Sequence, residues 1–239
     1  MPLHKAEDIV SIAKENGARA IQITGGEPMV YPWICEFIEY CSNKNLYTML
    51  ATSGYNHSKE LYRRLQASGL TAICVSINSI DENINIYSRQ GYTKAVQAIQ
   101  DAVTIDLPSF ANVVLNQTNL CNLERTVVSL QEMGVCGVQI LKRFSSYRGE
   151  IISPLNVEQL TELYRIATKY SDFVQVENCM RDYWHRFYSQ DLKCSDRGIL
   201  SAFWSVDGNI SPCSQKTECK YSSIHEMLAA MKQWEGDCR

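Results

Sequence analysis

The chain has 239 residues, a net charge of −3 and an isoelectric point of about 5.8. A slightly acidic net charge gives no indication of a basic surface for nucleic acid. No apolar run approaches the ~18–20 residues that a membrane helix needs. Hydrophobic residues make up 45% and charged residues 21% of the sequence, and no secretory segment is recognised, which together predict a globular, cytoplasmic protein.

Helix and strand signals alternate along most of the chain. Apolar residues at helical spacing predict helices, whereas short apolar runs predict strands. The last of these helices begins with the sequence pattern of a capping box, formed by Asn156 and Gln159. The expected helices are 6–16, 32–43, 58–68, 93–104, 122–133 and 156–170, and the expected strands are 19–24, 46–52, 71–77, 110–116 and 135–141.

This order gives five strands, each followed by a helix, with one further helix in front. Repeated βα units predict an α/β fold built on a parallel sheet. The pattern alone leaves a flavodoxin-like sheet open. We assign residues 1–172 to this domain and residues 173–239 to a small, cysteine-rich α+β extension.

Residues 24–28 read Thr-Gly-Gly-Glu-Pro directly after an apolar run. Gly25 and Gly26 allow the backbone to approach a ligand closely, and Pro28 cannot continue the strand. Glu27 places a carboxylate, which suits an ammonium group, at the carboxyl end of a strand, where ligand sites of barrels gather. The alternative is an ordinary turn with a surface glutamate.

Polar residues follow the later strands as well. Ser53 follows the second expected strand, Ser76 and Asn78 end the third, and Asn116 ends the fourth. Their hydroxyl and amide groups can bind ribose or carboxylate groups, and Arg89 can bind a carboxylate with two hydrogen bonds. The alternative is that serine and asparagine only complete turns here.

Ten cysteines are many for a chain of this length. In a reducing compartment, clustered cysteines bind metals or take part in catalysis more often than they form disulfides. Cys35, Cys74 and Cys136 are scattered in apolar segments, so we expect them to be buried as small hydrophobic residues.

The carboxyl-terminal cysteines form a spacing pattern. Thirteen residues separate Cys194 from Gly208, and four separate Gly208 from Cys213. Asp207-Gly208 predicts a hairpin that can bring Cys213 back near Cys194. Cys219 and Cys238 lie on either side of an expected helix at 222–234. Thiolates gathered in one pocket suit an iron–sulfur cluster or zinc, and a disulfide is the weaker alternative.

The element order and the Gly-Gly-Glu-Pro segment resemble the radical S-adenosylmethionine (radical SAM) enzymes over most of the chain. The resemblance implies a partial (β/α)6 barrel whose first strand is missing from this chain. It also implies that the Gly-Gly-Glu-Pro segment holds the amino group of S-adenosylmethionine. The cofactor-binding residues that it implies are Gly25, Gly26, Glu27, Pro28, Ser53, Ser76, Asn78, Arg89 and Asn116.

The Cys194, Gly208 and Cys213 spacing resembles the start of the SPASM and twitch extensions of these enzymes. A SPASM domain includes a Cys-x2-Cys pair that this chain lacks, so the smaller twitch form with one auxiliary 4Fe-4S cluster fits better. The resemblance implies Cys194, Cys213 and Cys219 as cluster ligands, with Cys238 as the fourth.

The family's Cys-x3-Cys-x2-Cys motif, which binds the radical-generating 4Fe-4S cluster, does not occur in the chain. The favoured explanation is that the chain starts after that segment. The other explanation is a relative that has lost its cluster loop.

The resemblance implies reductive cleavage of S-adenosylmethionine to a 5′-deoxyadenosyl radical, which abstracts hydrogen from a substrate. That substrate is a peptide or a small molecule, and a reducing partner such as flavodoxin or ferredoxin supplies the electron. The alternative function is that of a non-catalytic iron–sulfur or zinc-binding relative.

Overall fold

The computed structural model describes residues 1–142, 146–147, 150–151, 155–178, 180, 201–214 and 217–232. The chain divides into two compact units. The larger one contains Leu3–Arg143 and Pro154–Val176, and the smaller one contains residues 1–2, 144–153 and 177–239.

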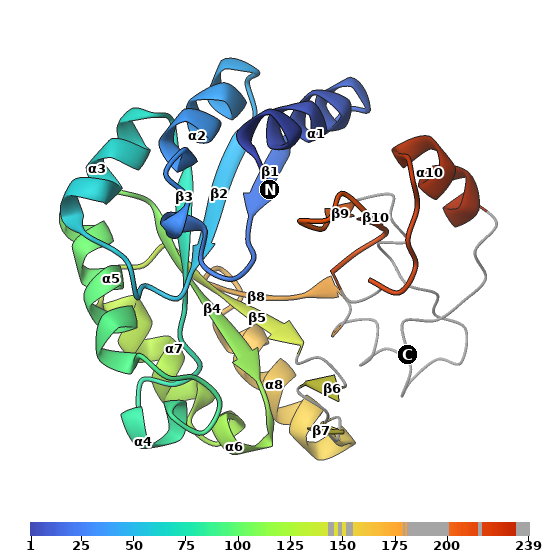
Figure 1. The fold of residues 1–239 in the computed structure, drawn as a ribbon. Coiled ribbons are helices and arrows are strands. Elements are labelled where there is room, and N and C mark those ends of the chain that lie inside the picture. The colour runs from blue at the N-terminus through green and yellow to red at the C-terminus, as the bar shows by residue number, and fades with distance from the viewer. Residues whose placement is uncertain are drawn as a thin grey trace. The chain divides into compact units, whose positions relative to one another are not determined.

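The larger unit is a curled, six-stranded parallel half-barrel in the order β1-β2-β3-β4-β5-β8 (Figure 1). Helices follow each of the strands β1 to β5 in the chain, which confirms the predicted α/β half-barrel. Its strands are β1 (Ala20–Ile23), β2 (Tyr47–Thr52), β3 (Ala72–Ser76), β4 (Ser109–Leu115), β5 (Gly137–Lys142) and β8 (Val174–Val176).

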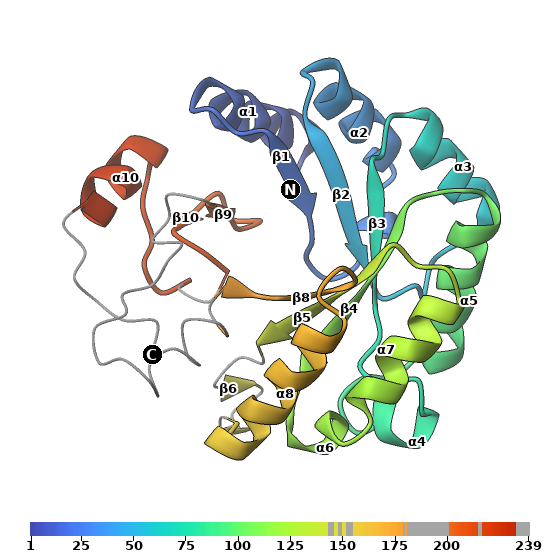
Figure 2. The same ribbon diagram turned by 180° about the vertical axis from the view of Figure 1, so that it is seen from behind.

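The long helices of this unit line the outer face of the sheet (Figure 2). The long ones are α1 (Leu3–Glu15), α2 (Ile34–Asn43), α3 (Lys59–Ala67), α5 (Tyr92–Thr104), α7 (Leu123–Glu132) and α8 (Val157–Lys169). The short ones are η1 (Pro28–Val30), α4 (Glu82–Asn85) and α6 (Gln117–Leu120).

The core lies between the sheet and these helices. Alternate residues of a strand point to opposite faces, so every second strand residue enters this layer. Leu50, Ile73, Val113 and Ile140 are fully buried there. The residues that alternate with these four along their strands therefore lie on the opposite face of the sheet, which is turned away from the helices.

The strand β8 was not predicted from the sequence. It pairs in parallel with β5, with Val138 opposite Val174 and Ile140 opposite Val176. Only three residues form it, so its apolar run is too short to show a strand period, and its partner is the reason it forms. The predicted capping box of α8 is confirmed, because Asn156 and Gln159 exchange hydrogen bonds of 2.8 and 2.9 Å.

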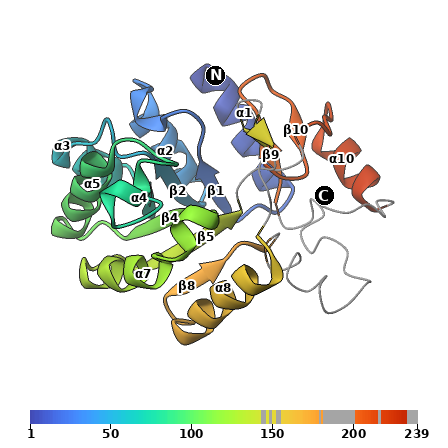
Figure 3. The same ribbon diagram turned by 90° about the horizontal axis from the view of Figure 1, so that it is seen from below.

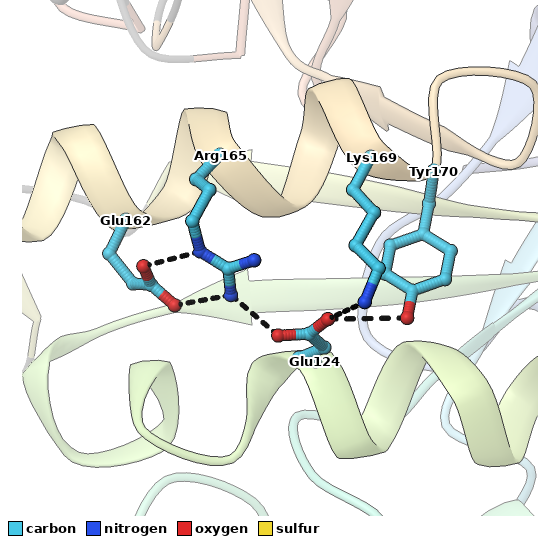
Figure 4. A network of polar contacts seen from close by, with 5 residues as sticks. All are labelled: Glu124, Glu162, Arg165, Lys169 and Tyr170. Carbon is cyan, nitrogen blue, oxygen red and sulfur yellow. Dashed lines mark hydrogen bonds and ion pairs between the residues drawn. The ribbon is translucent and has the colours of Figure 1, made fainter.

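Helices α7 and α8 lie next to each other and are joined by an exposed polar network (Figures 3 and 4). Glu124 of α7 accepts hydrogen bonds from Arg165 and Lys169 of α8 and from the hydroxyl of Tyr170. Arg165 also pairs with Glu162 one turn earlier. Surface pairs are individually weak, but a shared carboxylate makes this a network.

The smaller unit contains a hairpin of β9 (Phe203–Trp204) and β10 (Ile210–Ser211), which confirms the predicted turn at Asp207-Gly208. Gly208 has a φ of +85°, as such a turn requires. Helix α10 (Ile224–Lys232) follows, and a short antiparallel pair links β6 (Ser146–Tyr147) with β7 (Glu150–Ile151). The hairpin and α10 share a core of Ile210, Ile224, Met227 and Met231.

The three scattered cysteines differ in burial. Cys74 is buried in β3, and burial raises the pKa of its thiol to about 11. Cys35 is half-buried. Cys136 is exposed, so the expectation of burial was wrong there, because it lies in the turn that precedes β5 rather than within the strand. None of the helices in the described ranges has the length and hydropathy needed to cross a lipid bilayer.

Candidate functional site

Glu27 is tied to the carboxyl end of the neighbouring strand. Its Oε2 atom accepts hydrogen bonds from the hydroxyl of Ser53 at 2.6 Å and from the backbone N–H of Ser53 at 2.9 Å. The hydroxyl of Thr52 lies 2.8 Å from Oε1 and 2.9 Å from Oε2. The structure thus brings together Glu27 and Ser53, two of the residues named as cofactor-binding in the sequence analysis, and adds Thr52, which that analysis missed.

The two residues before Glu27 are both glycine, but the structural reason for a glycine differs between them. Gly25 has a φ of +138°, a region that other residues rarely adopt. Gly26 has no such φ, and a Cβ atom placed there would meet no described atom within 4 Å. Neither backbone conformation nor packing therefore explains the missing side chain of Gly26, whereas close approach of a ligand to this backbone would. Pro28 is buried and begins η1, with Glu27 as its N-cap.

Asn78 is part of a buried amide network that joins the ends of β3 and β4. Its Oδ1 accepts from the N–H of Val114 at 3.0 Å, and its Nδ2 donates to Ser88 at 2.9 Å. Asn119 donates from Nδ2 to the carbonyl oxygens of both Asn78 and Val114. These contacts give Asn78 a structural task, which is to fix the strand ends.

Asn116 and Arg89 adjoin this network. The Oδ1 of Asn116 caps α6 by accepting from the N–H groups of Thr118 and Asn119, while Asn119 accepts from the N–H of Asn116. The Nδ2 group of Asn116 makes no hydrogen bond to another residue within the described ranges and can serve a ligand. The backbone carbonyl of Arg89 accepts from Asn85 at 2.9 Å, which anchors the segment that carries it.

Ser76 belongs to a polar row on the sheet face that is turned away from the helices. It lies opposite Asn112 of β4, which lies opposite Gln139 of β5. Asn112 is 4% exposed, and its Oδ1 accepts no hydrogen bond from the described part of the chain. The sequence analysis missed Asn112 and Gln139, although their alternation with fully buried apolar neighbours was a usable signal.

The expected metal ligands are only partly described. Cys213 and Cys219 are half-buried and lie six positions apart in the chain. Cys194 and Cys238 lie outside the described residues. Within the described ranges, no three histidine, cysteine or acidic side chains gather closely enough to hold a metal.

Comparison with known proteins places the chain in a family. The sequence model described as the Radical SAM superfamily matches residues 1–129, more than half of the chain. This protein therefore belongs to the radical SAM superfamily. The half-barrel and the Gly25–Pro28 segment at its strand ends agree with that membership.

Two curated relatives illustrate the range of the family. The chain is 23% identical over 196 residues to the AdoMet-dependent heme synthase of Methanosarcina barkeri, covering 80% of this chain and 55% of the relative. It is 30% identical over 138 residues to the PqqA peptide cyclase of Granulibacter bethesdensis, covering 55% of this chain and 36% of the relative. The chain thus spans about half or less of the length of these relatives.

Among solved structures, Streptococcus suis SuiB has a similar fold. SuiB bound to S-adenosylmethionine superposes with a TM-score of 0.74 at 17% identity, over 99% of this chain and 59% of SuiB. SuiB bound to the precursor peptide SuiA gives a TM-score of 0.73 at 18% identity, over 99% of this chain and 58% of SuiB. At this identity the likeness establishes the fold alone.

Proposed function

We propose that this chain forms most of the barrel of a radical SAM enzyme that binds S-adenosylmethionine and abstracts hydrogen from a peptide substrate. The observation that carries the proposal is the cluster at the ends of β1 and β2. There the Glu27 carboxylate is oriented by Thr52 and Ser53, and Gly26 leaves the adjoining backbone open to a ligand. An ammonium group bound at this position would meet a fixed negative charge.

The remaining cofactor contacts are assigned to the neighbouring strand ends. The free Nδ2 of Asn116 offers a donor, and Ser76 lies beside the acceptor of Asn112. Arg89 supplies a cation for a carboxylate, and Asn78 holds these strand ends in place. If bound beside a reduced 4Fe-4S cluster that donates one electron, S-adenosylmethionine would supply a 5′-deoxyadenosyl radical, with methionine as the leaving group. This chain's own task is to orient the cofactor and to exclude water.

The peptide substrate is supported by relatives whose names or bound partners are peptides, namely PqqA peptide cyclase and SuiB with SuiA. The extension is proposed to be a twitch-type domain at 173–239, beside a barrel domain at 1–172, with one auxiliary cluster held by Cys194, Cys213, Cys219 and Cys238. A flavodoxin or ferredoxin as reductant and a cytoplasmic location complete the proposal, since cysteines remain available as thiolate ligands in a reducing compartment.

The decisive experiment has two stages. The DNA upstream of the Met1 codon is sequenced in frame, and the longest encoded protein is reconstituted anaerobically with iron, sulfide, dithionite and S-adenosylmethionine. We expect release of 5′-deoxyadenosine, abolished by Glu27→Ala and retained by Glu60→Ala, whose side chain lies exposed on α3. A reconstituted protein that binds S-adenosylmethionine equally well with either substitution would contradict the assigned site.

The second candidate is a metal-binding relative without catalysis, favoured by the lack of a Cys-x3-Cys-x2-Cys motif in this sequence. Elemental analysis of the purified protein distinguishes bound iron from bound zinc. The double substitution Cys213→Ala, Cys219→Ala should lose the auxiliary iron or zinc, whereas Cys121→Ala, which removes an exposed thiol on the barrel, should retain it. Bound metal without any 5′-deoxyadenosine release would support this second candidate.

A further inference from the structure

A histidine with a buried side chain contacts the loop that holds Glu27. His57 Nδ1 is 2.6 Å from the carbonyl oxygen of Gly54, and His57 Nε2 is 3.1 Å from Oδ2 of Asp101 on α5. The His57 side chain is 6% exposed and that of Asp101 12%. Neither residue belongs to a sequence motif, and 44 positions separate the two along the chain.

The partners of His57 define its hydrogen bonds. A carbonyl oxygen can only accept a hydrogen bond, so Nδ1 must carry a proton and donate it to Gly54. On the other side of the ring, Nε2 faces Asp101. Asp101 also faces Gln97 Nε2 at 2.9 Å and Lys59 Nζ at 3.5 Å from its Oδ1, so its carboxyl group is held in place from α5 and α3.

Two further groups around His57 and Asp101, Tyr62 and Lys59, come from α3. The ring of Tyr62 lies 5.8 Å from that of His57, and its fully buried hydroxyl has no hydrogen-bond partner in the described part of the chain. Burial, followed by the negative charges of Glu27 and Asp101, raises the pKa of Tyr62, so the phenol is neutral. Lys59 at the start of α3 completes the set of charges that face Asp101.

The loop above His57 is held from both sides. Gly54 donates its N–H to the hydroxyl of Thr52 at 2.9 Å, and Thr52 and Ser53 bind Glu27. The carbonyl of Gly54 is held by His57. Gly54 also has a φ of +78°, and a Cβ atom there would lie 2.8 Å from Cβ of Ala98, one turn before Asp101 on α5.

We propose that His57, held between the Gly54 carbonyl and Asp101, is a positioning residue that clamps the Thr52–Gly54 loop and so fixes Glu27 for the bound ligand. The identity of that ligand, S-adenosylmethionine, rests on the proposed function. The clamp itself does not, because it concerns the hydrogen bonds of the Ser53 and Gly54 amides.

The first test needs no ligand. Nitrogen-15 NMR of the full chain with labelled histidine reports which ring nitrogen carries a proton, with His57 assigned by its loss in His57→Gln. We expect a protonated Nδ1 in the wild type. Hydrogen exchange of the Ser53 and Gly54 amides should accelerate roughly tenfold in His57→Gln, the loss of one hydrogen bond, while the α8 amides stay unchanged. An unprotonated Nδ1, or unchanged exchange at Ser53 and Gly54, would overturn the proposal.

The second test measures the affinity of the full chain, reconstituted anaerobically, for S-adenosylmethionine by calorimetry. His57→Gln should bind roughly tenfold more weakly than the wild type. His4→Gln, a change at an exposed position on α1, is the matched control and should bind as the wild type does. Equal affinity of His57→Gln and the wild type would also refute the clamp. Failure of the wild type to bind would refute the proposed function and leave the exchange test to decide on His57.

Discussion

The hydroxyl of Ser53 lies 2.6 Å from Oε2 of Glu27, so the residue that follows β2 fixes the carboxylate that follows β1. Twenty-six positions separate the two residues, and parallel pairing of β1 with β2, with Ile23 opposite Leu50, brings them together. The site is therefore a product of strand register, and substitutions in the supporting residues should act on ligand binding and stability in distinct ways.

Removing the Ser53 hydroxyl should weaken ligand binding. Ser53→Ala deletes a charge-assisted hydrogen bond that orients Glu27, so we expect the affinity for S-adenosylmethionine to fall about tenfold. Calorimetry measures the effect. Ser129→Ala on α7 deletes a hydroxyl away from the strand ends and should leave the affinity unchanged. Equal affinity of the two variants would show that Glu27 does not need Ser53.

Adding a methyl group at Gly54 should be costlier than adding one at Gly17. Both residues have a positive φ, so an alanine at either position should lower the free energy of unfolding by about 1–2 kcal/mol, because the left-handed conformation is unfavourable for it. Only at Gly54 would the new Cβ clash with α5, which adds roughly 1–3 kcal/mol. Urea unfolding of Gly54→Ala and Gly17→Ala measures the difference. Equal losses of stability in the two variants would mean that α5 shifts to accommodate the new methyl group without a cost in free energy.

The buried amide network should be sensitive to truncation. Asn119→Ala removes the partners of the Asn116 N–H and of two carbonyl oxygens, so we expect a loss of about 3 kcal/mol in the free energy of unfolding. Asn83→Ala removes an exposed amide on α4 and should change stability by less than about 0.5 kcal/mol. Chemical denaturation of both variants measures the change in the free energy of unfolding. A small loss of stability for Asn119→Ala would show that water replaces the amide.

The network between α7 and α8 should make stability depend on pH in acid. Hydrogen bonds from Lys169 and then Arg165 lower the pKa of Glu124 to about 2 from its usual 4.5. A carboxyl whose pKa is lower in the folded state stabilises the protein above the unfolded value, and that contribution disappears as the pH falls from 4.5 to about 2.

The difference in unfolding free energy between wild type and Glu124→Gln should therefore be present at pH 7 and vanish as the pH approaches 2. High salt should reduce it, because the pair is exposed. Glu132→Gln, on the same helix, makes the same change in net charge and serves as the control. A difference that does not vary with pH would show that the ion pairs of Figure 4 contribute nothing through ionisation.

Much of the fold could be predicted because its signals are local. Helical spacing of apolar residues placed α5 and α7 within one residue at each end, and the capping box fixed the start of α8. The hairpin at Asp207-Gly208 followed from turn chemistry. The burial of Cys136 was misjudged, since an apolar setting in the sequence does not say where a strand begins.

The sequence by itself determined the alternation of strands and helices, the Gly25–Pro28 segment and the polar residues at strand ends. These depend on neighbours within a few positions, whose periodicity and caps act over one or two turns. Only the tertiary structure decided that β8 completes the sheet, that Asn112 lies beside Ser76, and that His57 meets Asp101. Such contacts depend on which strands pair and in which register, and their free energy appears only when distant segments pack together.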